Sequence, residues 1–272
     1  MDKAKLNFLT EQARVIRNTT IEMIGTLGVG HIGGSMSIIE ALTAIYYETA
    51  NLDPKNPHMG NRDRVVLSKG HAGPALYATL AEKGYFDRDW IYTLNKPGTN
   101  LPSHVDKNRT PGIDMTAGSL GQGISAAVGM AIAAKLDNNP CNVYAIIGDG
   151  ECQEGQVWEA LMLAGSRKLN NLIVLIDYNK MQIDGYIEEI NGIADLEAKF
   201  KAFRFNTLSV DGHDISAIVK AINNAKSQSE RPTMIILNTI KGKGFPEGEG
   251  KVSCHNMNMT EEVWRKAIEA NK

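Results

Sequence analysis

Ile146-Ile147-Gly148-Asp149-Gly150-Glu151 closes one apolar stretch of the chain, and Asp177-Tyr178-Asn179-Lys180 closes the next. Residues 143–147 and 172–176 have the length and composition of buried strands, and the segment between them has helical spacing. This pattern predicts a strand–helix–strand unit in which the carboxyl ends of two parallel strands lie side by side. Open α/β sheets bind their ligands at that edge.

Asp149 and Asn179, at the two predicted strand ends, are candidate ligands for a metal ion. Carboxylate and amide oxygens, with diphosphate oxygens and a water, suit the octahedral coordination of Mg²⁺. Gly148 and Gly150 allow the backbone to approach a ligand closely, and the helix that follows offers its positive N-terminus to a phosphate. A lone Gly-Asp-Gly is often an ordinary turn, but its pairing with Asn179 on the next strand argues against that interpretation.

The composition of the chain argues against several classes of protein. With 272 residues it can form one sizeable α/β domain or two small ones. Its net charge of −2, with acids and bases interspersed, argues against a nucleic-acid patch or a membrane anchor. The longest apolar stretches are strand-length, too short for a transmembrane helix. Three widely spaced cysteines and an N-terminus without an apolar signal core favour a cytoplasmic location.

Strands alternate with helices along the rest of the chain. Further strands are predicted near 64–68, 205–210 and 233–239, and helices near 4–27, 37–49, 73–83, 87–94, 121–136, 195–200, 214–226 and beyond 260. Residues 95–117 form a long loop, and 241–254 form a glycine-rich loop that we expect to be mobile. We therefore expect one domain over 1–272, an α/β fold with a doubly wound, mainly parallel sheet and helices on both faces.

Gly28-x-Gly30-x-x-Gly33 formally matches the dinucleotide-binding fingerprint. That fingerprint requires a preceding strand, whereas here the pattern predicts a preceding helix. We therefore reject a nicotinamide-dinucleotide site at this position.

Gly148-Asp149-Gly150, followed after about 28 residues by Asn179, resembles the thiamine diphosphate signature. The wider strings GDGECQEGQVWEAL and NLIVLIDYNKMQIDG resemble the transketolase family. The resemblance covers nearly all of this chain but only the diphosphate-binding domain of the family. It implies thiamine diphosphate and Mg²⁺ as cofactors, with Ca²⁺ or Mn²⁺ as alternative ions. It also implies transfer of a two-carbon ketol unit between sugars, typically sugar phosphates.

Four of the six histidines match motifs of this family. They are His31 in GHIGGSMS, His71 in SKGHA, His104 in LPSH and His255 in CHN. Imidazole is suited to moving protons near neutral pH. A single loop histidine is usually a surface residue, but four matches argue against coincidence. We expect His213 and His58 to be surface residues, although His58 lies in another family-like stretch.

The resemblance implies a role for each matching residue. Asp149, Asn179 and the main-chain carbonyl of Met181 would bind the divalent ion. The cofactor would contact His31, His71, Gly118, Ser119, Leu120, Gly150, Glu151, Asn179, Ile183 and His255. The catalytic residues would be His31, His71, His104 and His255, of which His31 and His104 would hydrogen-bond the ketose. Taken alone, the segment 118–123 could be a simple helix start.

The resemblance also implies a missing partner. Ordinary transketolases are more than twice as long, and the glutamate that activates the pyrimidine ring lies in a domain that this chain lacks. The chain therefore resembles the N-terminal subunit of a split transketolase, active only with a separate C-terminal subunit in an α2β2 complex. Glu154 and Glu159 match carboxylates at the subunit interface, although a solvated helix charge is the commoner fate of a glutamate.

Two other functions stay open from the sequence. Another thiamine-dependent subunit, either 2-oxoacid decarboxylating or similar to deoxyxylulose-phosphate synthase, would share the metal motif. The run Lys241-Gly242-Lys243-Gly244 is compatible with the second of these, whereas the histidines that serve sugar hydroxyls argue against the first. A non-catalytic cofactor-binding module is the other possibility, and the intact Asp149, Asn179 and histidine set argues against it.

Overall fold

A parallel sheet forms the centre of the computed structural model, which describes residues 1–183 and 185–272. Its strand order is β2-β3-β4-β6-β5, and every neighbouring pair is parallel. The strands are β2 at Arg64–Leu67, β3 at Val143–Gly148, β4 at Leu172–Tyr178, β5 at Asn206–Asp211 and β6 at Thr233–Asn238. Each of them lies where the sequence predicts a strand.

The central strands are buried on both faces, which explains their continuous apolar sequences. In β3, Tyr144 and Ile146 point to one face of the sheet, where they join the larger hydrophobic core. Val143, Ala145 and Ile147 point to the other face and join a second core. Each face therefore needs its own layer of helices.

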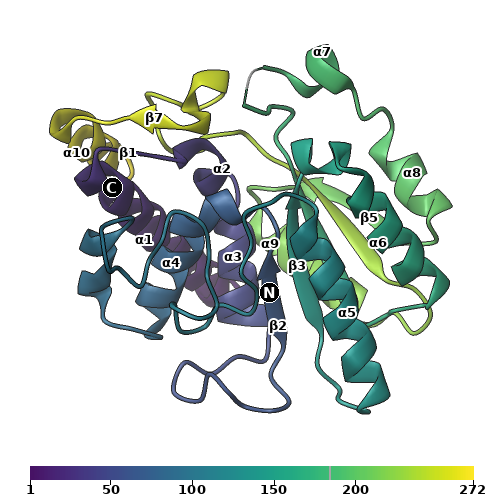
Figure 1. Cartoon of the computed structure of the whole chain (residues 1–272). Helices are drawn as coiled ribbons and strands as arrows, with labels where there is room; N and C mark the ends of the chain where they lie inside the picture. The colour runs from purple at the N-terminus through teal and green to yellow at the C-terminus, as the bar shows by residue number, and fades with distance from the viewer. Residues whose placement is uncertain (184) are drawn as a thin grey trace.

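Helices cover both faces of the sheet, as predicted for a doubly wound fold (Figure 1). On the face of Tyr144 lie α1 (Lys3–Leu27), α3 (Ile39–Ala44), α4 (Gly73–Lys83) and α9 (Ile215–Lys226). On the other face lie α5 (Gln122–Leu136), α6 (Gly155–Ser166) and α8 (Leu196–Ala202). The site described below lies where the strands of this sandwich end.

Smaller elements at the periphery bring distant segments together. A two-stranded antiparallel sheet pairs β1 (Val29–Gly30) with β7 (Met257–Asn258), and α10 (Glu261–Ala270) packs beside it against α1 (Figure 1). The remaining elements are α2 (Ile32–Met36), α7 (Ile187–Asn191), the π-helix Ile45–Thr49 and the 3-10 turns Gly70–Ala72, Arg88–Thr93, Gly150–Gln153 and Val252–His255. The β1–β7 pair holds the segment of His255 beside that of His31.

The second predicted helix, at 37–49, is confirmed within two residues as α3 and the π-helix that continues it to Thr49. The short helix α2 was not predicted: it begins at Ile32, inside the glycine-rich segment 28–34, and a turn separates it from α3. Packing explains the glycines within α2: a Cβ on Gly33 would lie 2.5 Å from Cys254 Sγ. Close tertiary contact here outweighs the low helix propensity of glycine.

The predicted long loop is present, because residues 95–117, all of which the structure describes, contain no helix or strand. Val105, Ile113 and Ala117 anchor it in the larger core. The ion pair between Arg62 and Asp114 adds a second attachment. The loop thereby delivers His104 to the carboxyl edge of the sheet.

The helices and the cysteines bear on the location that the sequence predicts. Over the part of the chain that the structure describes, none of the helices has the length and apolarity needed to cross a bilayer. Cys141, Cys152 and Cys254 are free and buried.

Candidate active site

A cavity of about 340 Å³ lies at the carboxyl edge of the sheet. Thirteen of the fifteen predicted site residues line it: His31, His71, His104, Gly118, Leu120, Asp149, Gly150, Glu151, Glu154, Asn179, Met181, Ile183 and His255. The two exceptions, Ser119 and Glu159, are exposed side chains outside the lining. Segments that lie far apart in the sequence therefore meet at the predicted place.

Asp149 and Asn179 stand at neighbouring strand ends. Gly148 pairs with Asp177 in the β3–β4 register, and the Asp149 amide donates to the Asp177 carbonyl at 3.2 Å. The Asp149 carboxylate accepts hydrogen bonds from the backbone amides of Gly150 (2.8 Å) and Lys180 (2.6 Å). Backbone donors thus fix the carboxylate at the floor of the cavity.

The donor set at these strand ends fits a hard divalent cation. The Asn179 amide nitrogen donates to Asp177 Oδ2 at 2.9 Å, and the Asn179 amide oxygen accepts from the Met181 backbone amide at 3.1 Å. One carboxylate, one amide oxygen and the Met181 carbonyl suit an ion that takes its other ligands from phosphate and water. No group of three His, Cys, Asp or Glu among the described residues forms a metal cluster.

The electrostatics at Asp149 also favour a cation. Burial and the nearby charge of Asp177 raise the pKa of this carboxyl to about 7, against the opposing effect of the two backbone hydrogen bonds. A divalent ion would offset the cost of holding both carboxylates charged at this edge.

A buried ion pair between Lys69 and Asp177 lies beneath the cavity, and the sequence did not predict it. The Lys69 Nζ and Asp177 Oδ2 atoms are 2.5 Å apart, and the two side chains are 2% and 0% exposed. Ser37 and Thr239 also donate to this carboxylate. Burial alone would raise the pKa of Asp177, but Lys69 and these donors lower it.

The four motif histidines form one cluster. The His31 ring centroid lies 5.5 Å from those of His71 and His255 and 5.6 Å from that of His104, and the His71–His255 distance is 5.2 Å. They come from the start of α2, the 3-10 turn before α4, the long loop and the turn before β7. The arrangement places several hydrogen-bonding nitrogens around one small volume.

Burial keeps the imidazoles of His31, His71 and His255 uncharged at neutral pH. It lowers the pKa of His31, and it lowers the pKa of His71 well below the usual value, with the charge of Lys69 adding to the effect. It lowers the pKa of His255 to about 4, assisted by Lys241. At neutral pH these rings can each donate one hydrogen bond and accept another.

Lys241 also lines the cavity and was missing from the predicted site. It is buried, and its ammonium group donates to the Gln182 carbonyl at 3.1 Å. Burial lowers its pKa. The available signal was its position, because the Lys-Gly-Lys-Gly run follows β6 at the same edge of the sheet. The cavity thus has two buried lysines, Lys69 and Lys241.

Glu151 is buried, and its carboxylate bonds to protein groups. It accepts hydrogen bonds from the Ser68 hydroxyl and from the backbone amides of Gly121 (2.9 Å) and Gly148 (3.0 Å). Ser68 follows β2, Gly121 precedes α5 and Gly148 ends β3, so the donors come from three separate segments at the sheet edge. In this structure Glu151 therefore holds the loops that surround the cavity together.

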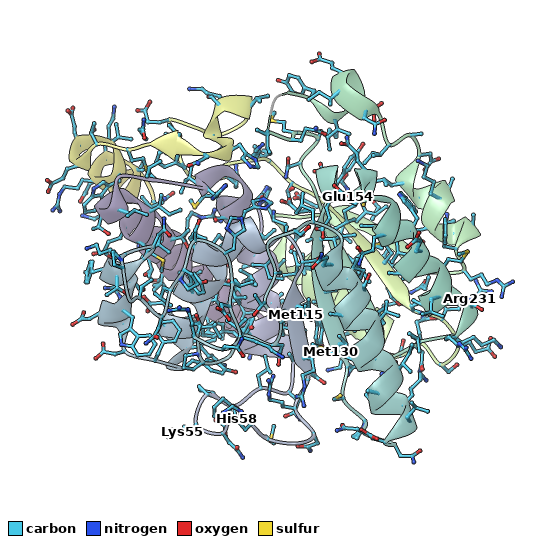
Figure 2. The ribbon with its side chains drawn as sticks, viewed as in Figure 1. Lys55, His58, Met115, Met130, Glu154 and Arg231 are labelled. Atoms are coloured by element: carbon cyan, nitrogen blue, oxygen red, sulfur yellow. The ribbon has the colours of Figure 1, made fainter. Side chains whose placement is uncertain are left out.

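Glu154 and Glu159 are exposed at the surface around α6. Figure 2 shows Glu154 in the upper half of the view and His58 on the loop at the bottom. Three apolar side chains on α5 and α6 are also exposed: Met162 (59%) and Leu163 (42%) on α6, and Leu136 (77%) on α5.

Comparison with known proteins agrees with this geometry. Residues 9–269 match the family model described as "Transketolase, thiamine diphosphate binding domain". The 6-deoxy-6-sulfo-D-fructose transketolase subunit SqwG of Clostridium sp. (strain MSTE9) is 58% identical, over 96% of this chain and 94% of that protein. An apulose-4-phosphate transketolase subunit of Phocaeicola vulgatus is 36% identical, over 94% of this chain and 91% of that protein.

Solved structures extend the comparison to longer enzymes. The crystal structure of transketolase from Campylobacter jejuni superposes on all of this chain with a TM-score of 0.92 at 35% identity. The present chain covers only 43% of that enzyme. It is thus similar along its whole length to proteins named as subunits, and to a part of the longer enzyme.

Proposed function

Since the chain belongs to the transketolase family, we propose that it uses thiamine diphosphate and Mg²⁺ to transfer a two-carbon ketol unit between sugars. One observation carries the proposal: the Asp149–Asn179 strand-end pair and the four-histidine cluster line the same cavity. The first feature suits a metal-bound diphosphate and the second suits sugar hydroxyls. Neither a dinucleotide site nor a simple metal site needs both.

The chain's own residues divide into two groups in this function. Asp149, Asn179 and the Met181 carbonyl would hold the ion, and Lys241 would face the diphosphate. The backbone at Gly118 and the side chains of Leu120 and Ile183 would border the rings of the cofactor. When bound, thiamine diphosphate supplies the nucleophilic carbon and the electron sink. His31 and His104 would orient the ketose, and the neutral His255 would move a substrate proton.

We propose 6-deoxy-6-sulfo-D-fructose as the ketose donor. The support is the 58% identity to the sulfofructose transketolase subunit, compared with 36% for the apulose-4-phosphate relative. A sulfonate is an anion like a phosphate but carries a single charge. A sugar phosphate, which the sequence suggested, is the competing donor.

The partner in this proposal is a separate C-terminal subunit. The chain covers 94% of the sulfofructose relative but 43% of the longer solved transketolase, which supports a division of the enzyme into two polypeptides. The exposed apolar side chains of α5 and α6, together with Glu154 and Glu159, are the surface that we assign to subunit contact. An α2β2 complex in the cytoplasm, with this chain as one domain, completes the proposal.

Activity should appear only in the complex. We would assay ketol transfer to an aldose acceptor with the chain alone and with the complex that it captures from its own cell extract. The donors would be 6-deoxy-6-sulfo-D-fructose and fructose 6-phosphate. We expect turnover by the complex alone and a higher kcat/KM for the sulfonate. Activity of the isolated chain would contradict the split enzyme, and a preference for the phosphate would contradict the substrate assignment.

His104→Ala should impair ketose turnover more than cofactor binding. The imidazole reaches the cavity from the long loop, at the ring cluster, so its loss removes a hydrogen-bonding group from the substrate side. We expect kcat/KM to fall on the order of 100-fold, with the Kd of thiamine diphosphate changed by less than about twofold. His58→Ala, in an exposed loop, is the control. Equal losses of turnover and cofactor affinity would contradict this role.

A further inference from the structure

The segment 240–244 enters the cavity directly after β6 and carries Lys241. Its glycines turn the chain: Gly242 and Gly244 have φ values of 77° and 76°, in the left-handed region. The sequence predicts a mobile segment here, and in the structure its backbone is hydrogen-bonded to other segments. The Gly242 amide donates to the Gly33 carbonyl at 3.0 Å, and the Lys241 carbonyl accepts from Gly250 at 2.8 Å.

His213 holds the first residue of this segment. Its Nε2 atom accepts a hydrogen bond from the Ile240 backbone amide at 2.8 Å. Since Nε2 is the acceptor, Nδ1 carries the proton and donates to Glu40 Oε2 at 3.2 Å. The expectation that His213 is an ordinary surface residue is therefore wrong: its side chain is 14% exposed and uses both ring nitrogens.

Arg17 holds the other end of the segment. Its guanidinium group donates to the Lys243 carbonyl at 2.5 Å and to the other oxygen of Glu40. A Cβ on Gly244 would lie 2.5 Å from Arg17 Cδ, so the segment packs directly on this side chain. Arg17 and Glu40 are 8% and 7% exposed.

We propose that Arg17, Glu40 and His213 form a clamp that sets the position of Lys241, and that His213 is thereby a positioning residue for cofactor binding. Glu40 joins the two ends of the clamp because one carboxylate oxygen faces each partner. None of the three lines the cavity, so the clamp acts through the backbone of 240–244. The inference rests on the proposed function, which places the cofactor diphosphate next to Lys241.

Cofactor affinity tests the clamp. We would titrate the full chain with thiamine diphosphate and Mg²⁺ by calorimetry and compare wild type with His213→Ala and His58→Ala. His58 is exposed, does not line the cavity and lies on the loop at the bottom of Figure 2, so it is a matched histidine control. We expect roughly tenfold weaker binding for His213→Ala and no change for His58→Ala. Unchanged affinity in both would overturn the proposal.

A double-mutant cycle separates positioning from general destabilisation. If His213 acts through Lys241, His213→Ala should weaken binding by less than about twofold in a Lys241→Met background. A full tenfold loss in that background would overturn the proposal. His213→Gln keeps an acceptor for the Ile240 amide, so we expect it to restore most of the affinity. If His213→Ala folds poorly, His213→Gln is the variant to titrate with the cofactor.

Amide hydrogen exchange tests the clamp without any cofactor. The peptide covering 240–244 should exchange faster in His213→Ala than in wild type, whereas His58→Ala should match wild type. Equal exchange in all three would overturn the clamp. If the complex of wild type with its C-terminal subunit binds no thiamine diphosphate, the proposed function fails, and faster exchange in His213→Ala would still support the clamp.

Discussion

Asp177→Ala should lower the free energy of unfolding by about 3–5 kcal/mol. The substitution leaves the Lys69 ammonium group buried without its carboxylate partner, because both side chains are almost wholly inaccessible to solvent. It also removes the acceptor of the Ser37 hydroxyl and of the Asn179 amide. Urea denaturation of the full chain, at a pH where Lys69 is charged in the unfolded state, measures the loss.

A surface ion pair provides the control for this experiment. Glu197→Ala breaks the pair with Lys201, whose side chains are 47% and 59% exposed, and should cost less than about 0.5 kcal/mol. Replacing both Lys69 and Asp177 by Met and Leu should recover part of the loss, because no buried charge is then left unpaired. A loss below about 1 kcal/mol for Asp177→Ala would contradict the buried character of the pair.

Asp149→Asn should abolish the Mg²⁺-dependent part of thiamine diphosphate binding. The substitution keeps the size of the side chain but removes the single carboxylate of the proposed metal site. Calorimetric titration with Mg²⁺, and again with a chelator, gives the dependence directly. Unchanged affinity in the presence of Mg²⁺ would rule out the metal assignment.

The same variant should change how stability depends on pH. The pKa of Asp149 rises from its ordinary 3.8 to about 7 in the fold. A carboxyl group with a raised folded pKa stabilises the fold below its ordinary pKa, and this contribution is lost as the pH rises through 7. In metal-free buffer, we expect wild type to lose on the order of 2–3 kcal/mol relative to Asp149→Asn between pH 5 and pH 8. A constant difference would contradict the raised pKa.

The parts of the fold that depend on local pattern could be predicted from the sequence. Strands β2, β3, β4 and β6 are largely buried apolar runs, whereas the edge strand β5 has a mixed sequence and no buried residue. Asp149 and Asn179 could be paired because parallel strands that follow each other through one helix end at the same edge. That reasoning needs only the order of elements along the chain.

The contacts that were missed depend on register and on distant backbone groups. Lys69 follows β2, whereas Asp177 lies near the end of β4. These two strands are not neighbours in the sheet, so no local pattern indicates the ion pair. His213 binds the backbone of Ile240 and the carboxylate of Glu40, which lies 173 positions away in sequence. Helix α2 was missed because the reason for its glycines is contact with Cys254, at the far end of the chain.

The Glu151 carboxylate limits where this fold can diversify. Because one side chain bonds to Ser68, Gly121 and Gly148, inserting a residue in any one of the turns beside them should disturb the contacts to the other two. A change in the length of these turns would therefore need several simultaneous substitutions. The long 95–117 loop carries His104 into the same cavity without helix or strand constraints. Directed evolution toward new sugars should therefore accept insertions in that loop and reject them in the turns that Glu151 joins.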